Sequence, residues 1–208
     1  LDIQLKILGK DHPDVATSYS NIGLVYNDQG KKDEALKYFN KALDIELKTL
    51  GKDHHDVAIS YNNIGSVYYD QGKSGKALKY WNKALHIRTN KLGEDHPSVA
   101  RLYGHIGNAY GKIDQHTESI KYHTKALKIR LKRFGEDHAD VAISYSNMAN
   151  TYKRQGKYNE ALECKKKAFN IRKTTLGTHH HRTLRTLKST LELKRYLNRV
   201  RDETREAY

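Results

Sequence analysis

The chain has 208 residues, a formal net charge of +14 at pH 7 and one cysteine. A lone cysteine excludes an intrachain disulfide framework and favours a reducing compartment, and no apolar run approaches the roughly 18 residues that a membrane-spanning helix needs. We therefore expect a soluble cytoplasmic protein whose excess positive charge suits an acidic partner.

A short pattern, Leu-Gly-x-Asp-His, recurs every 42 residues along the chain. It begins at Leu8, Leu50 and Leu92, with Phe in place of Leu at Phe134 and a weakened copy at Leu176. A constant repeat length in this range is the signature of a stacked repeat protein, in which each unit packs on its neighbours. Function is then expected on the surface of a solenoid.

Each period contains two stretches with helical spacing of apolar residues. The first stretch of the first full period ends at Gly30, where a helix C-cap favours a left-handed residue. Asp11 is expected to cap that first helix at its N-terminus. The first helix is lined by Val15, Tyr19, Ile22 and Tyr26. The second and longer helix is lined by Ala35, Leu36, Phe39, Ala42, Leu43, Ile45 and Leu50.

The repeat length predicts the organisation of the chain. We predict the end of a preceding second helix over residues 1–8 and a C-terminal capping helix over residues 177–208, lined by Leu184, Leu187, Leu191, Tyr196 and Leu197. Four repeats are predicted between them, over residues 9–50, 51–92, 93–134 and 135–176. Because the opening residues align with Leu43–Gly51, we expect the chain to be part of a longer array.

These positions resemble the tetratricopeptide repeat family. The first repeat carries the pattern as Tyr19, Ile22, Gly23, Tyr26, Ala35, Phe39 and Ala42, and the second as Tyr61, Ile64, Gly65, Tyr68, Ala77, Trp81 and Ala84. The later repeats depart from it at Ser119, His123 and Lys165. The 42-residue period is similar to that of the kinesin light chain and nephrocystin-3 subgroup. The resemblance implies an all-α, right-handed superhelical solenoid of helix-turn-helix repeats.

The resemblance also implies a binding surface, because in this family the first helices line a concave face where peptides bind. Asparagine amides offer both a donor and an acceptor to an extended backbone, and a guanidinium suits a carboxylate. The alternative is that these positions are the wet face of amphipathic helices. The positions carried over are Asn21, Asn62, Asn63, Ser66, Arg101, His105, Asn108, Asn147, Asn150, Lys153 and Arg154.

Charge is unevenly distributed between the predicted repeats. Residues 9–50 carry a net charge of −1, whereas residues 51–92, 93–134, 135–176 and 177–208 carry +4, +4, +3 and +4. A basic groove favours a peptide with acidic residues. The resemblance to kinesin light chains points the same way, since it implies short acidic peptides that contain a tryptophan.

Enzymatic and metal chemistry are not expected. The sequence has no phosphate-binding glycine loop and no His-Glu-x-x-His motif, and His12, His54, His96 and His138 are separated by whole repeats. We therefore predict no catalytic residue, no metal site and no cofactor. The function expected is a protein-interaction scaffold that binds an extended, acidic peptide. Two alternatives remain open: a structural spacer or end-to-end self-associating array, and nucleic-acid binding through the basic surface.

Overall fold

The computed structural model describes residues 2–206, with side chains described as far as residue 203. Within residues 2–206 the chain forms ten helices and no strand, which confirms the all-α prediction. The helices are α1 (Asp2–Leu8), α2 (Pro13–Asp28), α3 (Lys32–Thr49), α4 (His55–Asp70), α5 (Ser74–Leu92), α6 (Pro97–Lys112), α7 (His116–Phe134), α8 (Ala139–Arg154), α9 (Tyr158–Leu176) and α10 (His181–Glu206). The predicted end segments include residues 1, 207 and 208, which lie outside the described residues.

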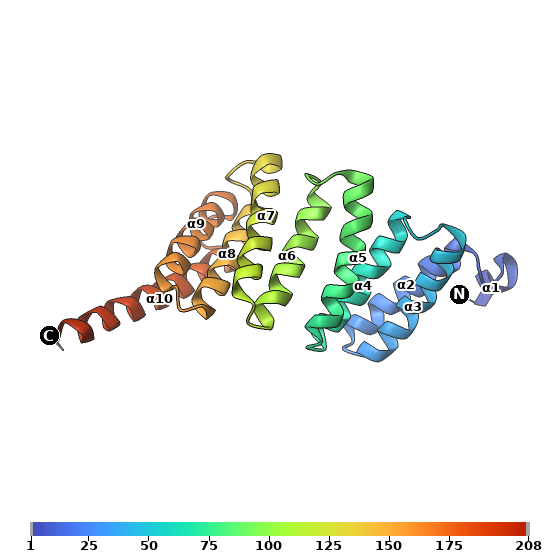
Figure 1. The fold of residues 1–208 in the computed structure, drawn as a ribbon, viewed down its shortest axis with the longest axis horizontal. Coiled ribbons are helices and arrows are strands. Elements are labelled where there is room, and N and C mark those ends of the chain that lie inside the picture. The colour runs from blue at the N-terminus through green and yellow to red at the C-terminus, as the bar shows by residue number, and fades with distance from the viewer. Residues whose placement is uncertain (1, 207–208) are drawn as a thin grey trace. The chain divides into compact units, whose positions relative to one another are not determined.

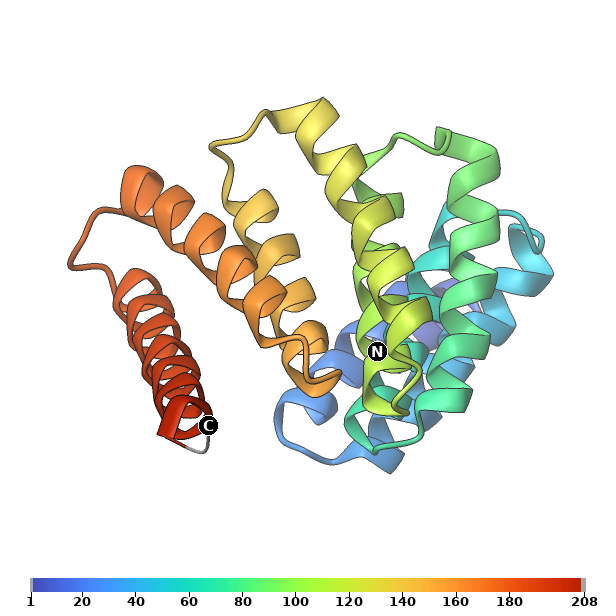
Figure 2. The same ribbon diagram turned by 60° about the vertical axis from the view of Figure 1, so that its left-hand side comes forward.

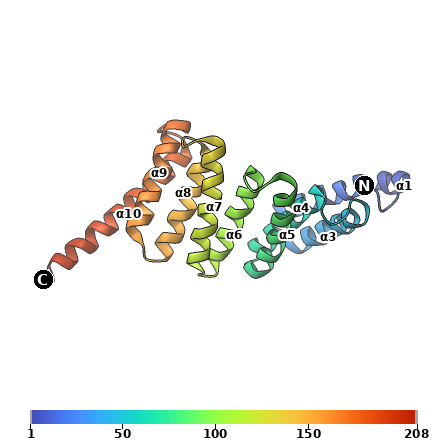
Figure 3. The same cartoon turned by 45° about the horizontal axis from the view of Figure 1, so that its top comes forward.

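The helices form two compact units, Leu1–Ala109 and Tyr110–Tyr208, whose boundary falls within α6. In the first unit α2 packs against α3, α3 against α4, and α4 against α5, as Figure 1 shows. In the second unit α7 packs against α8, α8 against α9, and α9 against α10, which Figures 2 and 3 show from two directions. Consecutive helices along the chain therefore pack side by side within each unit. The repeat boundaries given above remain a prediction.

The two helices of the α2–α3 and α4–α5 hairpins approach closely where a glycine faces an aromatic ring. A Cβ atom placed on Gly23 would lie 2.8 Å from ring carbons of Phe39, and one on Gly65 would lie 2.7 Å from the indole of Trp81. Both rings are buried. The mid-helix glycine therefore leaves the space that the aromatic ring of the second helix fills.

Histidine, not aspartate, caps the first helices. The backbone N–H of Asp14 donates to Nδ1 of His12 at 3.2 Å, and His54 and His138 cap α4 and α8 in the same way. The prediction that Asp11 caps the first helix was therefore wrong by one residue. The imidazole nitrogen of His12 reaches the orphan amide that a carboxylate or hydroxyl oxygen satisfies at most N-caps.

The last helix buries a threonine-rich face. Thr183, Thr186, Thr190 and Leu193 are buried, whereas Leu184 and Leu191 are exposed. The leucine-lined face predicted for this segment was therefore wrong at Leu184 and Leu191, whereas Leu187 and Leu197 are half-buried. The helix itself was predicted. Threonine hydroxyls on this face find partners, since Thr183 donates to the carbonyl of Arg172 at 3.2 Å. In Figure 1 the C-terminal end of α10 extends beyond α9.

Candidate functional site

The predicted site residues all lie on α2, α4, α6 and α8, the first helices of the predicted repeats. We call this set the first-helix face. Its exposed members are Asn21, Arg101, Asn150, Lys153 and Arg154. Its half-buried members are Asn62, Asn63, Ser66, His105, Asn108 and Asn147.

On α4, three members of the first-helix face lie together. The Nδ2 atom of Asn62 donates to Oδ1 of Asn63 over a long 3.5 Å, and the Ser66 hydroxyl donates to the backbone carbonyl of Asn62 at 3.0 Å. The indole Nε1 of Trp81 donates to that same carbonyl at 3.2 Å. The Ser66 proton is therefore used within the helix, while the Asn63 amide keeps both hydrogens for a ligand.

His105 lies against an aromatic neighbour and does not continue the asparagine series. Its ring centroid is 5.1 Å from that of Trp81, which in turn lies 5.5 Å from the Tyr69 ring. These rings form a continuous aromatic group in the first unit. Because Trp81 is buried, only the half-buried Tyr69 and His105 rings would offer an apolar or aromatic group of a ligand a packing surface.

Arg101 adds positive charge to the same unit. The Arg88 guanidinium is buried. This burial lowers the pKa of Arg88 below its usual value, and the nearby positive charge of Arg101 lowers it further by a smaller amount. Two like charges therefore repel each other, Arg88 on α5 and Arg101 on α6, and Arg101 is exposed to solvent. An anion at Arg101 would relieve this repulsion.

Asn21 lies at a hollow of about 520 Å³ on α2, together with Ile22, Val25 and Tyr26. Val25 is 56% exposed and Leu24 is 44% exposed. The part of the first-helix face on α2 is therefore more apolar than we expected from the asparagine positions in the sequence.

In the second unit, Arg154 is partly used by the fold. Its Nη1 donates to the carbonyl of Gly111 at 2.9 Å, which ties the end of α8 to the end of α6. The remaining guanidinium donors can still contact a ligand. Asn147 and Asn150 lie one turn apart on the same helix.

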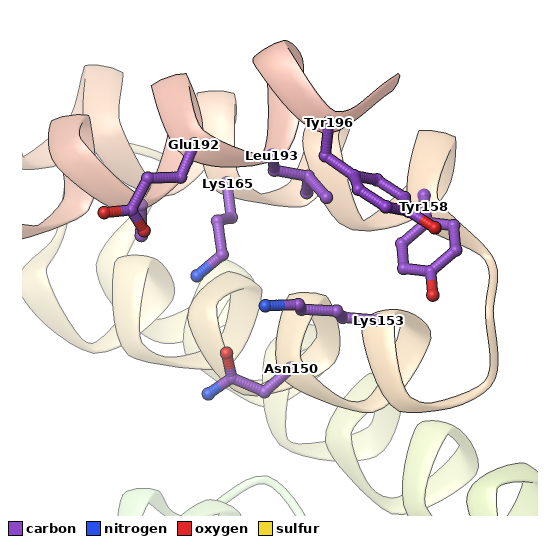
Figure 4. Close-up of a pocket in the computed structure, with 8 residues that line it drawn as sticks. Asn150, Lys153, Tyr158, Lys165, Glu192, Leu193 and Tyr196 are labelled. Atoms are coloured by element: carbon purple, nitrogen blue, oxygen red, sulfur yellow. The ribbon is translucent and has the colours of Figure 1, made fainter. Parts of the chain in front are cut away.

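Asn150 and Lys153 line a cavity of about 370 Å³ between α8, α9 and α10, which Figure 4 shows. Its other lining residues are Tyr158, Lys165, Ser189, Glu192, Leu193 and Tyr196. The sequence interpretation missed Lys165 and the α10 residues as site residues. The sequence does indicate that Lys165 is unusual. It stands 42 residues after His123 and 84 after Trp81, at a repeat position that carries an aromatic ring or an imidazole in the earlier repeats.

Within the described residues, no group of three His, Cys, Asp or Glu side chains is placed to hold a metal ion. No helix in this range is both long and apolar enough to cross a membrane. Cys164 is buried, and burial raises the pKa of its thiol, which keeps it protonated and unreactive.

The family follows from comparison with known proteins. A family model described as tetratricopeptide repeat matches residues 1–48, 33–89, 56–132, 98–174 and 140–202. The chain belongs to the tetratricopeptide repeat family. No curated protein matches the chain.

Solved structures of kinesin light chain-like proteins share the fold. BtubC (BKLC) from P. vanneervenii is 26% identical, with a TM-score of 0.73 over 82% of this chain and 68% of that chain. A putative kinesin light chain from Podosopora anserina, with nearly identical TPR-like repeats, is 21% identical, with a TM-score of 0.74 over 93% of this chain and 98% of that chain. A variant of that Podosopora anserina protein with one substituted residue gives a TM-score of 0.75 at 21% identity, over 94% and 98% of the two chains.

These comparisons confirm the tetratricopeptide fold and its likeness to kinesin light chains. Tetratricopeptide repeats indicate a protein–protein interaction scaffold, and proteins built from them are generally non-catalytic. A protein is therefore the class of partner to expect for this chain.

Proposed function

We propose that this scaffold binds an extended, acidic peptide along its first-helix face. The observation that carries the proposal is the recurrence of asparagine amides, at Asn21, Asn63 and Asn147, on a face that also holds exposed cationic groups. Amides can pair with the backbone of an extended peptide without demanding one sequence. Because helices hold these side chains before the peptide arrives, little ordering cost falls on the protein.

The charge distribution supports an acidic ligand. Residues 51–208 carry the whole positive excess of the chain, while residues 9–50 have a net charge of −1. Arg101 on α6 and Lys153 on α8 are both exposed on the first-helix face. A basic surface speeds the encounter with an acidic peptide and disfavours a basic one.

The test is fluorescence anisotropy of a labelled acidic peptide, beside its basic counterpart and a single-stranded RNA, at low and physiological salt. We expect saturable binding of the acidic peptide that persists at physiological salt. The double variant Asn63→Ala with Asn147→Ala is expected to weaken this binding by about tenfold, since each lost hydrogen bond contributes about 0.5–1.5 kcal/mol.

The matched control is Asn82→Ala with Asn170→Ala, which removes two exposed asparagines from the second helices α5 and α9. We expect this control to bind the peptide as the unaltered chain does. RNA binding alone would instead favour a nucleic-acid function. If no peptide binds and the molar mass of the protein in light scattering rises with protein concentration, the self-associating array would be favoured.

A further inference from the structure

The cavity between α8, α9 and α10 lies where a lysine replaces a core side chain. Phe39, Trp81 and His123 occupy equivalent positions 42 residues apart, and each is no more than 2% exposed. Lys165 is the next residue in this register and is only half-buried. Its narrow aliphatic chain leaves unfilled the space that a ring occupies in the earlier repeats, and α8, α9 and α10 enclose the cavity of about 370 Å³ there.

Two ammonium groups point into this cavity, and Glu192, the acidic residue that also lines it, forms no ion pair with either of them. Figure 4 shows the side chains of Lys153 and Lys165 converging beside the amide of Asn150. Within the described residues, neither lysine forms a hydrogen bond or an ion pair with another side chain. Burial lowers the pKa of Lys165 below its usual value, as do, more weakly, the charges of Lys153, Arg172 and Arg185, while the charge of Glu192 opposes this shift in part. A partly buried cation such as Lys165 that forms no ion pair is costly, so an incoming anion gains more here than on an open surface.

The opposite end of the cavity is apolar. Leu193 is buried, and the Tyr158 and Tyr196 rings lie with their centroids 4.9 Å apart. Figure 4 places these three side chains beyond the lysine pair. The cavity therefore suits a side chain such as glutamate, with its carboxylate toward the lysines and its methylene groups toward the apolar end.

We propose that this cavity binds one side-chain carboxylate of the acidic peptide, with Lys153 and Lys165 as its cationic contacts. The inference rests on the proposed function and adds the subsite that selects acidic residues. Glu192 also lines the cavity and carries the opposite charge, so Lys153, Lys165 and Glu192 together carry +1. A single carboxylate neutralises that charge. A phosphate dianion would exceed it and would be repelled by Glu192.

The test is a double-mutant cycle between protein and peptide, measured by anisotropy. The probe is a labelled, C-terminally amidated peptide of alternating Glu and Ser, together with versions in which each Glu in turn is Gln. Against the unaltered chain, we expect one Glu→Gln version to bind about tenfold more weakly than the parent, as for loss of a charge-assisted hydrogen bond. With the Lys165→Met protein, we expect the parent peptide and this Glu→Gln peptide to bind with equal affinity.

The controls separate a direct contact from a general loss of charge or of folding. Lys173→Met removes the same charge from an exposed position on α9 and should leave the cycle unchanged. Lys153→Met alters an exposed side chain, so it leaves the packing of the core unchanged. It should abolish the Glu-to-Gln difference in affinity, as Lys165→Met does. Glu192→Gln should tighten binding several-fold, because it removes from the cavity lining a carboxylate that repels the ligand.

The outcomes distinguish this subsite from the function on which it rests. If no acidic peptide binds the unaltered chain, both proposals fail. If the peptide binds but Lys165→Met and Lys153→Met retain the full Glu-to-Gln difference, the carboxylate subsite is wrong while the peptide-binding face stands. Tighter binding of a phosphoserine version than of the Glu parent would also overturn the assignment of a carboxylate.

Discussion

A glycine stands in the middle of α2 and α4 because an aromatic ring occupies the place of its side chain. The ring atoms of Phe39 and Trp81 come within 2.8 Å and 2.7 Å of where a Cβ would lie on Gly23 and Gly65. Glycine costs a helix about 1 kcal/mol relative to alanine. At these two sites the packing of a buried ring offsets that cost.

The first prediction contrasts two glycines on neighbouring helices. Gly65→Ala should lower the free energy of unfolding by about 1–2 kcal/mol, since the cost of overpacking against Trp81 exceeds the gain in helix propensity. Gly75→Ala should raise it by about 0.5–1 kcal/mol, because Gly75 is helical and nothing lies within 4 Å of its added Cβ. Urea denaturation measures both changes. Equal effects of the two substitutions would contradict the packing argument.

In the third predicted repeat, His123 takes the place of the core aromatic residue. This replacement lowers the stability of the fold at acidic pH. Burial, together with the nearby charge of Arg130, lowers the pKa of His123 from 6.5 to about 4. The unfolded chain therefore binds a proton at this residue at higher pH than the folded chain does. The stability that depends on neutral His123 is complete above about pH 6.5 and is lost as the pH falls toward 4.

The second prediction follows from this linkage. On going from pH 7 to pH 4, His123 should contribute a loss of up to about 3 kcal/mol in the free energy of unfolding. The His123→Phe variant has no imidazole to protonate at this position. Between pH 7 and pH 4 its loss in free energy of unfolding should therefore be smaller than that of the unaltered chain, by about the contribution of His123. Urea titrations at the two pH values give the comparison, and an identical loss in both proteins would show that His123 is not buried in its neutral form.

At the scale of the element, an imidazole nitrogen caps all four of the first helices α2, α4, α6 and α8. His12, His54, His96 and His138 each accept a hydrogen bond from the backbone amide two residues later. The recurrence of Asp-His every 42 residues is therefore explained by helix capping. This cap satisfies one of the amides that have no partner within the helix.

The third prediction uses two adjacent histidines. His54→Ala should lower the free energy of unfolding by about 0.5–2 kcal/mol through loss of the cap on α4. His55→Ala should change it little, because His55 is exposed within the first turn of the same helix. Thermal denaturation of both variants decides the matter. Equal melting temperatures for the two would mean that the His54 ring contributes no cap.

The sequence predicts the helices well because their glycines and apolar periods repeat without a shift. It predicts the ends of the helices less well, since a histidine nitrogen replaces the expected Asp11 oxygen. The buried face of α10 was not predictable from apolar residues alone. Its threonines are buried because their hydroxyls find acceptors in α9 and within α10 itself, a property that hydrophobicity does not report.

The same distinction applies to the candidate site. The register identified which positions share a helix face, yet it could not show that Ser66 and Arg154 use donors within the fold. It also treated Lys165 only as a departure from the family pattern. The cavity at Lys165 depends on the volume of a missing ring and on side chains from three helices, and such volumes require coordinates.

At the scale of the whole molecule, the net charge of +14 sets how a ligand is attracted. The fourth prediction is that raising NaCl from about 50 to about 500 mM weakens acidic-peptide binding several-fold without abolishing it. Added salt screens the exposed cations, whereas hydrogen bonds to the asparagine amides and the sheltered Lys165 are screened less. Anisotropy titrations across this range give the dependence, and affinity that vanishes at the higher salt would mean that charge alone holds the ligand.

The most direct test of the central claim is an NMR titration of the side-chain amide resonances with the acidic peptide. The first-helix face predicts saturable shifts of the Asn63, Asn147 and Asn150 amides, while those of Asn82 and Asn170 on second helices stay in place. Shifts confined to Asn82 and Asn170 would place the ligand on the second helices and contradict the account.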